Sequence, residues 1–170
     1  MYNIRHIQET DIPVLALFEA EISEISFGDE AVTDADFHAR KLKKGFDKDP
    51  SGMFVMVERR DQDKNGVLAN ARDKAPDAAA GERVIGWLWM DGKENFLTGE
   101  SYVNFRSFYI AVEYRGSEAA RALMGRGMEY CREAGAKSVV GKVHVSNLPM
   151  RALYREFGFQ ATHITMEYKI

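Results

Sequence analysis

The sequence is poor in cysteine and in long hydrophobic runs, and each scarcity argues against a class of protein. Its 170 residues include one cysteine, Cys131, so no disulfide can form within the chain, which is typical of a reducing compartment. No apolar run reaches the length of about 20 residues that a membrane-spanning helix needs. The N-terminal residues also lack the hydrophobic core of a signal peptide. We therefore expect a cytoplasmic protein without a membrane partner.

An excess of positive charge is missing as well. The 23 Lys and Arg residues against 26 Asp and Glu residues give a net charge of −3, so nucleic acid is not an expected partner. The basic run at 40–44 lies in a helical pattern, and we interpret it as a solvated helix face. The four histidines lack metal-ligand spacing, so no metal is expected. Glycine-rich dinucleotide and P-loop patterns are absent, which argues against an unrelated nucleotide-binding protein.

What is present is the composition of an ordinary globular domain, with 45% hydrophobic and 29% charged residues. The length suffices for one well-buried domain, residues 1–170, and is short for two. Periodicity predicts the order β-α-α-β-β-β-α-β-α-β. The expected strands are 2–7, 53–59, 84–90, 101–110 and 138–145, the best-marked helix is 118–134, and one long or two very short strands follow 159.

Two connecting segments stand out by composition. Residues 61–83 are rich in Asp, Ala, Lys, Asn and Gly without a usable periodicity, and we interpret them as a mobile hairpin insertion within the domain. Residues 19–34 are acidic. They are either a solvated loop with carboxylates near helix starts, or a rim that attracts a cationic acceptor molecule.

The most informative stretch is residues 105–159. An apolar strand pattern runs into a polar turn at 113–117, and a helix, a second strand and another helix follow. Such a βαβ unit places a helix N-terminus beside the end of a strand, where orphan amide groups and the helix dipole favour an anion. Taken alone, the turn is better explained as a simple turn and helix N-cap.

Two motifs in this stretch resemble those of the GNAT superfamily of N-acetyltransferases. The sequence RGSEAA at 115–120, after a strand and a tyrosine, is similar to the acetyl-CoA signature Arg/Gln-x-x-Gly-x-Gly/Ala. The second motif is Asn147, then Tyr154 seven residues later, then FGF at 157–159. Both stand in the order and at the spacing of the family. The resemblance is sharp over about residues 105–160 and is one of topology before them.

The resemblance implies a mixed α/β fold of the GNAT type. Its central, mostly antiparallel sheet would have six to seven strands, flanked by about four helices, with the fourth and fifth strands splayed apart. It implies transfer of an acetyl group from acetyl-CoA, the co-substrate, to a primary amine of a small molecule, peptide or protein. The alternative is a non-catalytic GNAT-fold protein that binds acyl-CoA weakly or not at all, or serves as an interaction module. The sequence leaves a homodimer open.

The resemblance also implies a cofactor site, with the pantetheine arm along the end of the fourth strand and the pyrophosphate on the turn. Glu118 departs from the family because it stands where the central glycine is expected. It adds bulk and negative charge beside the pyrophosphate, unless it swings outward or pairs with Arg115 or Arg121. The implied cofactor-binding residues are Phe108, Tyr109, Ile110, Arg115, Gly116, Ser117, Glu118, Ala119, Ala120, Arg121 and Asn147, the last of which also caps a helix.

For catalysis the resemblance implies Tyr154 as the general acid that protonates the leaving thiolate, with a core aromatic as the alternative. A phenol of pKa about 10 stays protonated yet can donate to a thiolate whose conjugate acid has a pKa of about 8.5. The general base is not marked, because Lys142 stands where N-terminal acetyltransferases of the family often carry glutamate. His144, or a water relay to an acidic-loop carboxylate, could replace it. Since this loop commonly helps form the family's acceptor pocket, Glu21 and Glu24 are candidate substrate residues.

Overall fold

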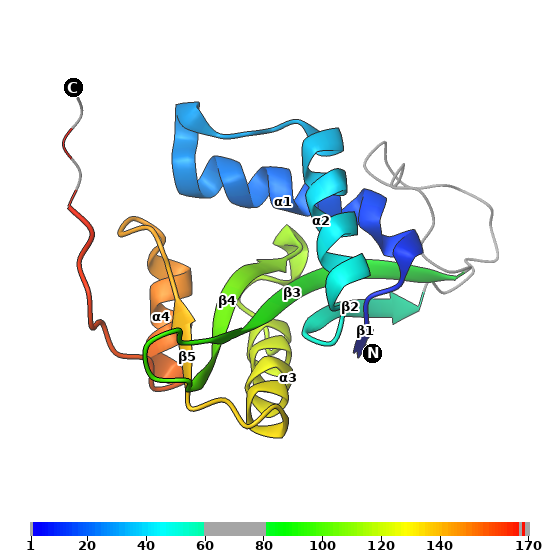
Figure 1. The fold of residues 1–170 in the computed structure, drawn as a ribbon. Helices are drawn as coiled ribbons and strands as arrows, with labels where there is room; N and C mark the ends of the chain where they lie inside the picture. The colour runs from blue at the N-terminus through cyan, green and yellow to red at the C-terminus, as the bar shows by residue number, and fades with distance from the viewer. Residues whose placement is uncertain (1, 60–80, 167, 169–170) are drawn as a thin grey trace, which may run out of the picture.

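The computed structural model describes residues 2–59, 81–166 and 168, and the structural statements below concern these residues (Figure 1). Most of the insertion expected at 61–83 lies outside them, and its last two residues already belong to a strand. The elements are β1 (Tyr2–His6), α1 (Ile12–Phe27), α2 (Ala35–Lys48), β2 (Met53–Arg59), β3 (Glu82–Glu94), β4 (Ser101–Ile110), α3 (Ala119–Glu133), β5 (Ser138–Gly141) and α4 (Leu148–Glu156), with short 3-10 turns at Glu9–Asp11, Gly28–Glu30 and Val112–Tyr114.

The strands form a single mixed sheet in the order β1-β2-β3-β4-β5. Neighbours from β1 to β4 pair antiparallel, and β5 joins β4 in parallel. The mixed α/β class and the mostly antiparallel sheet are therefore confirmed. The expected count of six to seven strands is wrong for the described residues, which contain five. Residues 160–166, where closing strands were expected, form no strand and run outward from the body (Figure 1).

Helices cover both faces of the sheet (Figure 1). On one face, Phe18 of α1 stacks on Tyr109 of β4 with ring centroids 4.2 Å apart. On the same face, α2 packs so closely that a Cβ at Gly45 would lie 2.6 Å from the ring of Trp89. The α1–α2 face is thus closed over the two tryptophans of β3, Trp87 and Trp89, both of which are buried.

On the opposite face, α3 lies against β3 through a glycine. A Cβ at Gly127 would come within 2.6 Å of Met90 and 2.7 Å of Leu88, so only glycine permits this approach. Gly125, two residues earlier, faces open space. The core between these layers includes Met53 to Val57 of β2, which are buried on both faces, as expected for an interior strand.

Two strand ends differ from the sequence-based expectation by four residues, while the end of β1 and the start of β3 differ by one and two. β3 continues past Gly92 to Glu94, because the reversal into β4 is made by Asn95, whose side-chain oxygen accepts hydrogen bonds from the amides of Leu97 and Thr98. β5 ends at Gly141 rather than at residue 145, because β4 parts from it there. None of the helices in the described ranges is long and apolar enough to cross a membrane.

Candidate active site at the splay of β4 and β5

The site begins where β4 and β5 part. The two strands pair in parallel from Tyr102 with Ser138 to Phe105 with Gly141. Beyond Phe105, β4 continues to Ile110 paired with β3 but no longer with β5. The predicted splay between the fourth and fifth strands is therefore confirmed. Beyond Phe105, the amide and carbonyl groups of β4 that face β5 have no strand partner among the described residues. We call the region between the two strands beyond this point the splay.

A β-bulge in β4 lies at the start of the splay. Trp89 pairs with Ser107 and Met90 pairs with Phe105, which leaves Arg106 as the extra residue. The Arg106 guanidinium lies 4.4 Å from the centroid of the Trp89 ring and donates a hydrogen bond of 3.0 Å to Asp91. The bulge turns the rest of β4 away from β5, so Phe108, Tyr109 and Ile110 lie on the unpaired part of the strand, where the resemblance places the pantetheine arm.

Tyr154 reaches from α4 to the point where the strands part. A Cβ at Gly141 would lie 2.3 Å from the Tyr154 hydroxyl oxygen, so the hydroxyl rests against the last paired residue of β5. Its ring packs edge-on to Phe105 at 5.5 Å and beside Phe159 at 4.6 Å, and the residue is only 7% exposed. Burial raises the pKa of Tyr154 above its ordinary value. Tyr154 is thus both a core aromatic and a protonated hydroxyl at the splay.

The turn at the start of α3 has the form of an anion site. Gly116 has φ of +78°, a conformation that favours glycine, and it reverses the chain before the helix. The Ser117 hydroxyl donates to the carbonyl of Tyr114 at 2.6 Å and accepts from the amide of Ala119 at 3.2 Å. The next first-turn amides, those of Ala120 and Arg121, lie at the helix N-terminus, where an anion is favoured.

Glu118 turns away from the helix axis and pairs with Arg121. Its carboxylate lies 2.6 Å from the Arg121 guanidinium, and its side chain is 74% exposed. Arg121 also bonds Glu156 of α4. Both carboxylates raise the pKa of Arg121, Glu156 more than Glu118. If an anion binds beside it, Glu118 was expected from the sequence either to swing outward or to pair with Arg115 or Arg121. In the structure Glu118 pairs with Arg121.

Arg115, in contrast, folds back toward β4. Its Nε donates to the carbonyl of Ile110 at 2.9 Å, and its guanidinium lies 5.3 Å from the centroid of the Tyr109 ring. A further guanidinium nitrogen is 3.9 Å from Glu21 of α1. Arg115 therefore links the turn to the end of β4 and to the acidic helix.

The Tyr109 hydroxyl ties Glu21 to the end of β4. It donates a hydrogen bond of 2.6 Å to Oε2 of Glu21. Burial and this carboxylate raise the pKa of Tyr109 above its ordinary value, so the phenol remains a donor. Among the predicted substrate residues, Glu21 is thus brought to the splay. Glu24 is exposed one turn further along α1, and its carboxylate bonds no described residue.

The remaining predicted residues lie on the loop between β5 and α4. The side-chain oxygen of Asn147 accepts from the amide of Met150 at 3.1 Å and caps α4, as the motif predicted. His144 is exposed, and its Nδ1 lies 2.6 Å from the hydroxyl of Ser146 in the same loop. None of its contacts in the described part of the chain joins it to Tyr154, Tyr109 or Glu21.

Sequence reasoning missed a buried carboxylate beneath this site. Glu19 is 3% exposed, accepts from the indole nitrogen of Trp87 at 2.9 Å, and pairs with Lys41 at 3.0 Å. A signal was present, because Glu19 follows Leu15 by four residues and so lies on the buried face of α1. Its place in the acidic segment obscured that signal.

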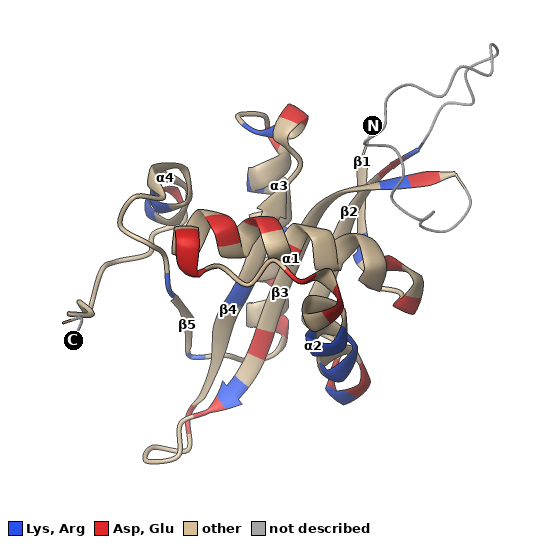
Figure 2. Cartoon of the chain, turned by 90° about the horizontal axis from the view of Figure 1, so that it is seen from above, with Lys and Arg blue, Asp and Glu red and all other residues tan. Residues whose placement is uncertain are grey.

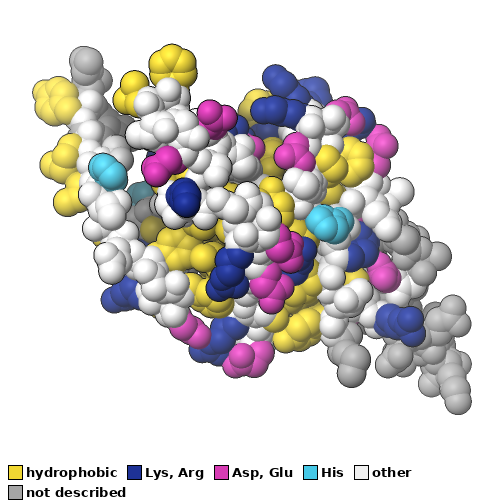
Figure 3. Space-filling view, turned by 60° about the horizontal axis from the view of Figure 1, so that its bottom comes forward, with side chains coloured by type: hydrophobic (Ala, Val, Ile, Leu, Met, Phe, Trp, Pro, Cys, Tyr) yellow, Lys and Arg dark blue, Asp and Glu magenta, His cyan; other side chains and the backbone are white. Residues whose placement is uncertain are grey.

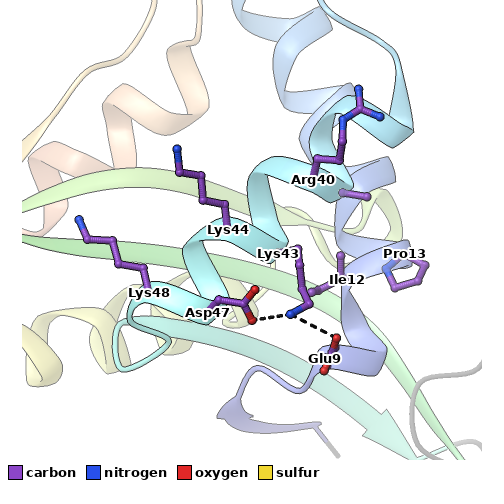
Figure 4. Close-up of a pocket in the computed structure, with 9 residues that line it drawn as sticks. Glu9, Ile12, Pro13, Arg40, Lys43, Lys44, Asp47 and Lys48 are labelled. Atoms are coloured by element: carbon purple, nitrogen blue, oxygen red, sulfur yellow. Dashed lines mark hydrogen bonds and ion pairs between the residues drawn. The ribbon is translucent and has the colours of Figure 1, made fainter.

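A separate groove of about 820 Å³ between the start of α1 and α2 shares no residue with the splay (Figure 4). Lys43 bonds Asp47 and lies 3.5 Å from Glu9, while Arg40, Lys44 and Lys48 extend outward from α2 (Figure 4). This is the solvated basic face that the sequence predicted. No group of three or more His, Cys, Asp or Glu residues that could hold a metal ion is found in the described ranges.

Comparison with known proteins relates this geometry to one family. A family model described as the acetyltransferase (GNAT) family matches residues 27–159. A candidate ribosomal protein bS18-alanine N-acetyltransferase of Bacillus subtilis (strain 168) is 37% identical over 59 residues, 35% of this chain and 39% of that protein. The uncharacterized N-acetyltransferase YycN of the same strain is 26% identical over 87 residues, 51% of this chain and 54% of that protein. The matches thus span about half or less of these relatives.

Solved structures resemble the whole chain in fold. A candidate acetyltransferase of Pyrococcus furiosus has a TM-score of 0.69 at 20% identity, with 100% of both chains covered. The structure of AAC(6')-Iy in complex with the bisubstrate analog CoA-S-monomethyl-acetylneamine has a TM-score of 0.65 at 12% identity, covering 100% of this chain and 98% of that one. At these identities the likeness concerns the fold.

Proposed function

Because the chain belongs to the GNAT acetyltransferase family, we propose that it transfers the acetyl group of acetyl-CoA to a primary amine of a small molecule, peptide or protein. One observation carries the proposal. The Tyr154 hydroxyl lies where β4 and β5 part, and the stretch of β4 beyond this point has no strand partner on the β5 side and leads in sequence to the N-terminus of α3, which favours an anion. The expected cytoplasmic location is part of this proposal and rests on the scarcity of cysteine.

The cofactor would be held mainly by backbone groups. Phe108, Tyr109 and Ile110 would offer amides and carbonyls to the pantetheine arm, as a partner strand would. The amides of Gly116, Glu118, Ala120 and Arg121 would hold the pyrophosphate, and Asn147 would also contact the cofactor. The bond from Arg115 to the carbonyl of Ile110 uses one acceptor on this path, so Arg115 would release it when the arm binds.

The chemistry needs an oxyanion stabiliser and a proton for the leaving thiolate. An unpaired amide of β4 beyond the bulge would donate to the thioester oxygen as the amine attacks, an effect worth a few kcal/mol. The carbon–sulfur bond then breaks, and the Tyr154 hydroxyl would give its proton to the CoA thiolate. Burial raises the pKa of Tyr154, which keeps the hydroxyl protonated until the thiolate forms but also makes it a weaker acid. The support for this role is therefore the position of the hydroxyl at the splay.

Glu21 is the carboxylate best placed to accept the amine proton. It is held at the end of β4 by Tyr109 and lies near Arg115, whereas His144 bonds only within its own loop. The chain thus supplies a base from the acidic helix, directly or through one water, rather than from the fifth strand.

The acceptor is proposed to be cationic. Acidic residues lie along the C-terminal half of α1, which passes over β4 in the view of Figure 2, so a protonated amine would be drawn toward Glu21. The names of two similar proteins fit a basic acceptor, the alanine of ribosomal protein bS18 in one and an acetylneamine analog in the other. A protein N-terminus and a polyamine-like small molecule are therefore the acceptors to test first.

The test has two stages. Acetyl-CoA should raise the melting temperature in a concentration-dependent way, because a ligand that binds only the folded state adds about 2.7 kcal/mol at a hundredfold excess over its Kd. NAD, which also carries an adenosine pyrophosphate, is the control. A screen of peptides and amines for thiol release then tests catalysis. Stabilisation without thiol release would support the non-catalytic alternative, and absence of stabilisation would reject the cofactor assignment.

A further inference from the structure

The hairpin between β3 and β4 presents two large apolar side chains to solvent. Phe96 is 98% exposed and Leu97 is 89% exposed. Hydrogen bonds hold the tip that carries them: the amide of Asn95 donates to the carbonyl of Glu100, and the amide of Gly99 donates to the carbonyl of Asn95, both at 2.8 Å. The side-chain oxygen of Asn95 accepts from two further amides of the tip. Because the turn is already ordered, a partner could bind both side chains at little cost in conformational entropy.

Two carboxylates flank this tip. Glu94 and Glu100 are exposed, and neither pairs with a cation of the described residues. The Glu94 carboxylate lies beside the turn, since a Cβ at Gly99 would be 4.0 Å from it. Contact between two such tips, or with an anionic membrane surface, is disfavoured because like charges repel. The tip therefore fits an apolar surface that is bordered by positive charge.

The groove between the start of α1 and α2 offers such a surface. Its volume of about 820 Å³ can hold two large side chains. The apolar residues that line it are Ile12, Pro13 and Ala39. Its two carboxylates, Glu9 and Asp47, are both paired with Lys43. The negative charge within the groove is thus already offset by a cation of the same chain.

The other cations of this groove have no ion-pair partner in the part of the chain that the structure describes. Arg40, Lys44 and Lys48 are exposed and line the groove. They stand four residues apart on one face of α2, so each lies about 6 Å from the next along the helix axis. Their side chains extend outward from α2 (Figure 4). They are therefore free to pair with the two carboxylates of the tip.

The tip and this groove lie on the same side of the molecule. Figure 2 shows the loop that joins β3 to β4 and the Lys and Arg residues of α2 toward the lower edge of the view. In Figure 3 a dark blue cluster stands at the upper edge, with hydrophobic and acidic side chains to its left. Phe96 and Leu97 are almost fully exposed, so the tip does not fill the groove of its own chain. Two copies related by a two-fold axis could face each other on this side, each tip against the groove of the other.

We propose that two copies of the chain form such a dimer. Phe96 and Leu97 of each copy enter the groove between α1 and α2 of the other, and the flanking carboxylates pair with the free cations of α2. A reciprocal contact covers both apolar tips and neutralises both charged surfaces within one closed assembly. The dimer stands apart from the acetyl-transfer proposal, because none of these residues is assigned to cofactor or acceptor.

Sedimentation velocity over a wide range of protein concentration tests the proposal. The parent chain is expected to dimerise, and high salt should weaken the dimer because exposed ion pairs are screened. Phe96→Ala/Leu97→Ala removes the apolar side chains of the tip and should weaken the dimer about a hundredfold or more. A parent chain that is monomeric throughout, or a dimer that survives this double variant, overturns the proposal.

Charge reversal identifies the surface that the tip meets. Glu94→Lys/Glu100→Lys reverses the tip, and Arg40→Glu/Lys44→Glu reverses the groove. Each variant alone should be monomeric, because like charges then face each other. An equimolar mixture of the two should dimerise again, because every tip then meets a groove of opposite sign. A mixture that stays monomeric, or either variant dimerising alone as the parent does, overturns the proposal.

A matched control separates this contact from net charge. Arg132→Glu/Lys137→Glu changes the net charge as much as the groove reversal does, at exposed cations outside α2, and should dimerise like the parent. Far-UV circular dichroism checks that every variant is folded. Loss of the dimer in this folded control would show that net charge, rather than the groove, governs association, and would overturn the proposal.

Discussion

The two ends of the splay between β4 and β5 are built in different ways. At the proposed cofactor end, Gly116, Ser117 and the start of α3 are consecutive in sequence and present backbone amides. At the proposed acceptor end, Tyr109 and Glu21 are 88 residues apart and meet through side chains. Beneath them, Trp87 and Glu19, 68 residues apart, also meet through side chains.

This difference has a functional consequence. Backbone amides survive most substitutions, so the cofactor end should tolerate changes of side chain. The acceptor end depends on single hydrogen bonds between distant elements. Removing one side chain of such a pair therefore leaves the other misplaced or with an unsatisfied donor or acceptor. Substitutions at the two ends should therefore differ in effect, and the largest effect is expected at Tyr154.

Tyr154→Phe should have the largest effect. The change deletes only the hydroxyl at the splay and keeps the ring packed on Phe105 and Phe159. Because the proton is needed only as the thiolate leaves, kcat should fall by about 10²–10⁴-fold while KM for acetyl-CoA changes little. Steady-state thiol release measures both constants.

Tyr130→Phe is the matched control, since the Tyr130 hydroxyl bonds Ser51 away from the splay. The raised pKa of Tyr154 adds a second readout. Because the Tyr154 hydroxyl stays protonated above the ordinary phenol pKa of about 10, loss of its proton should not lower kcat as the pH rises to about 10. A phenylalanine variant that turns over at the parent rate would reduce Tyr154 to a core aromatic.

Glu21→Gln tests the acceptor end directly. The amide keeps the shape of the side chain and can still accept from Tyr109 but cannot take up the amine proton, so kcat should fall by about 10²-fold. Tyr109→Phe leaves the carboxylate in place but frees it from β4, and its loss should be smaller. Equal rates for Glu21→Gln and the control Glu24→Gln, at saturating acceptor, would remove Glu21 from the mechanism.

Glu19→Ala tests the support beneath that end. The change leaves the buried indole N–H of Trp87 without its acceptor, which costs about 1–3 kcal/mol of folding free energy. Lys41 is partly exposed and can turn to water, so its contribution is small. Urea unfolding at unchanged m-value measures the loss, and Glu19→Gln, which keeps an acceptor for Trp87, should lose less. If both variants match the parent, the buried bond contributes nothing.

Glu118→Gly should have the smallest effect, because it acts at the cofactor end. Removing a carboxylate and a Cβ beside the pyrophosphate turn should tighten CoA binding. The gain in affinity for CoA should be about fivefold or less, because Arg121 already pairs with the Glu118 carboxylate and offsets its charge. Calorimetric titration with CoA measures it, and Glu118→Gln separates the charge from the Cβ. Unchanged affinity in both variants would mean that the departure from the family motif is harmless.

Much of the cofactor end could be predicted from sequence, and little of the acceptor end could. The turn at Gly116, the start of α3 and the cap at Asn147 depend on neighbours within a few residues, and the expected positions agree with the structure. Tyr154 was singled out by the resemblance to the family, and its place at the splay depends on Phe105 and Gly141. The base could not be predicted, because it depends on which of several carboxylates on α1 faces Tyr109. Helix periodicity alone left Glu21 and Glu24 equivalent.

The sequence by itself determined the order of strands and helices and the turn before α3, because local hydrogen bonding and periodicity act over short separations in the chain. The mixed fold was implied by the resemblance of its motifs to those of the family. Only the tertiary structure decided that β4 bulges at Arg106, that Glu118 pairs with Arg121, and that Glu19 is buried. The burial of Glu19 depends on Trp87, 68 residues away, and the bulge depends on the pairing of β4 with β3. Glu118 and Arg121 are only three residues apart, but Arg121 is also held by Glu156 of α4. Tertiary packing selects one contact partner for a side chain among the several that the sequence pattern allows.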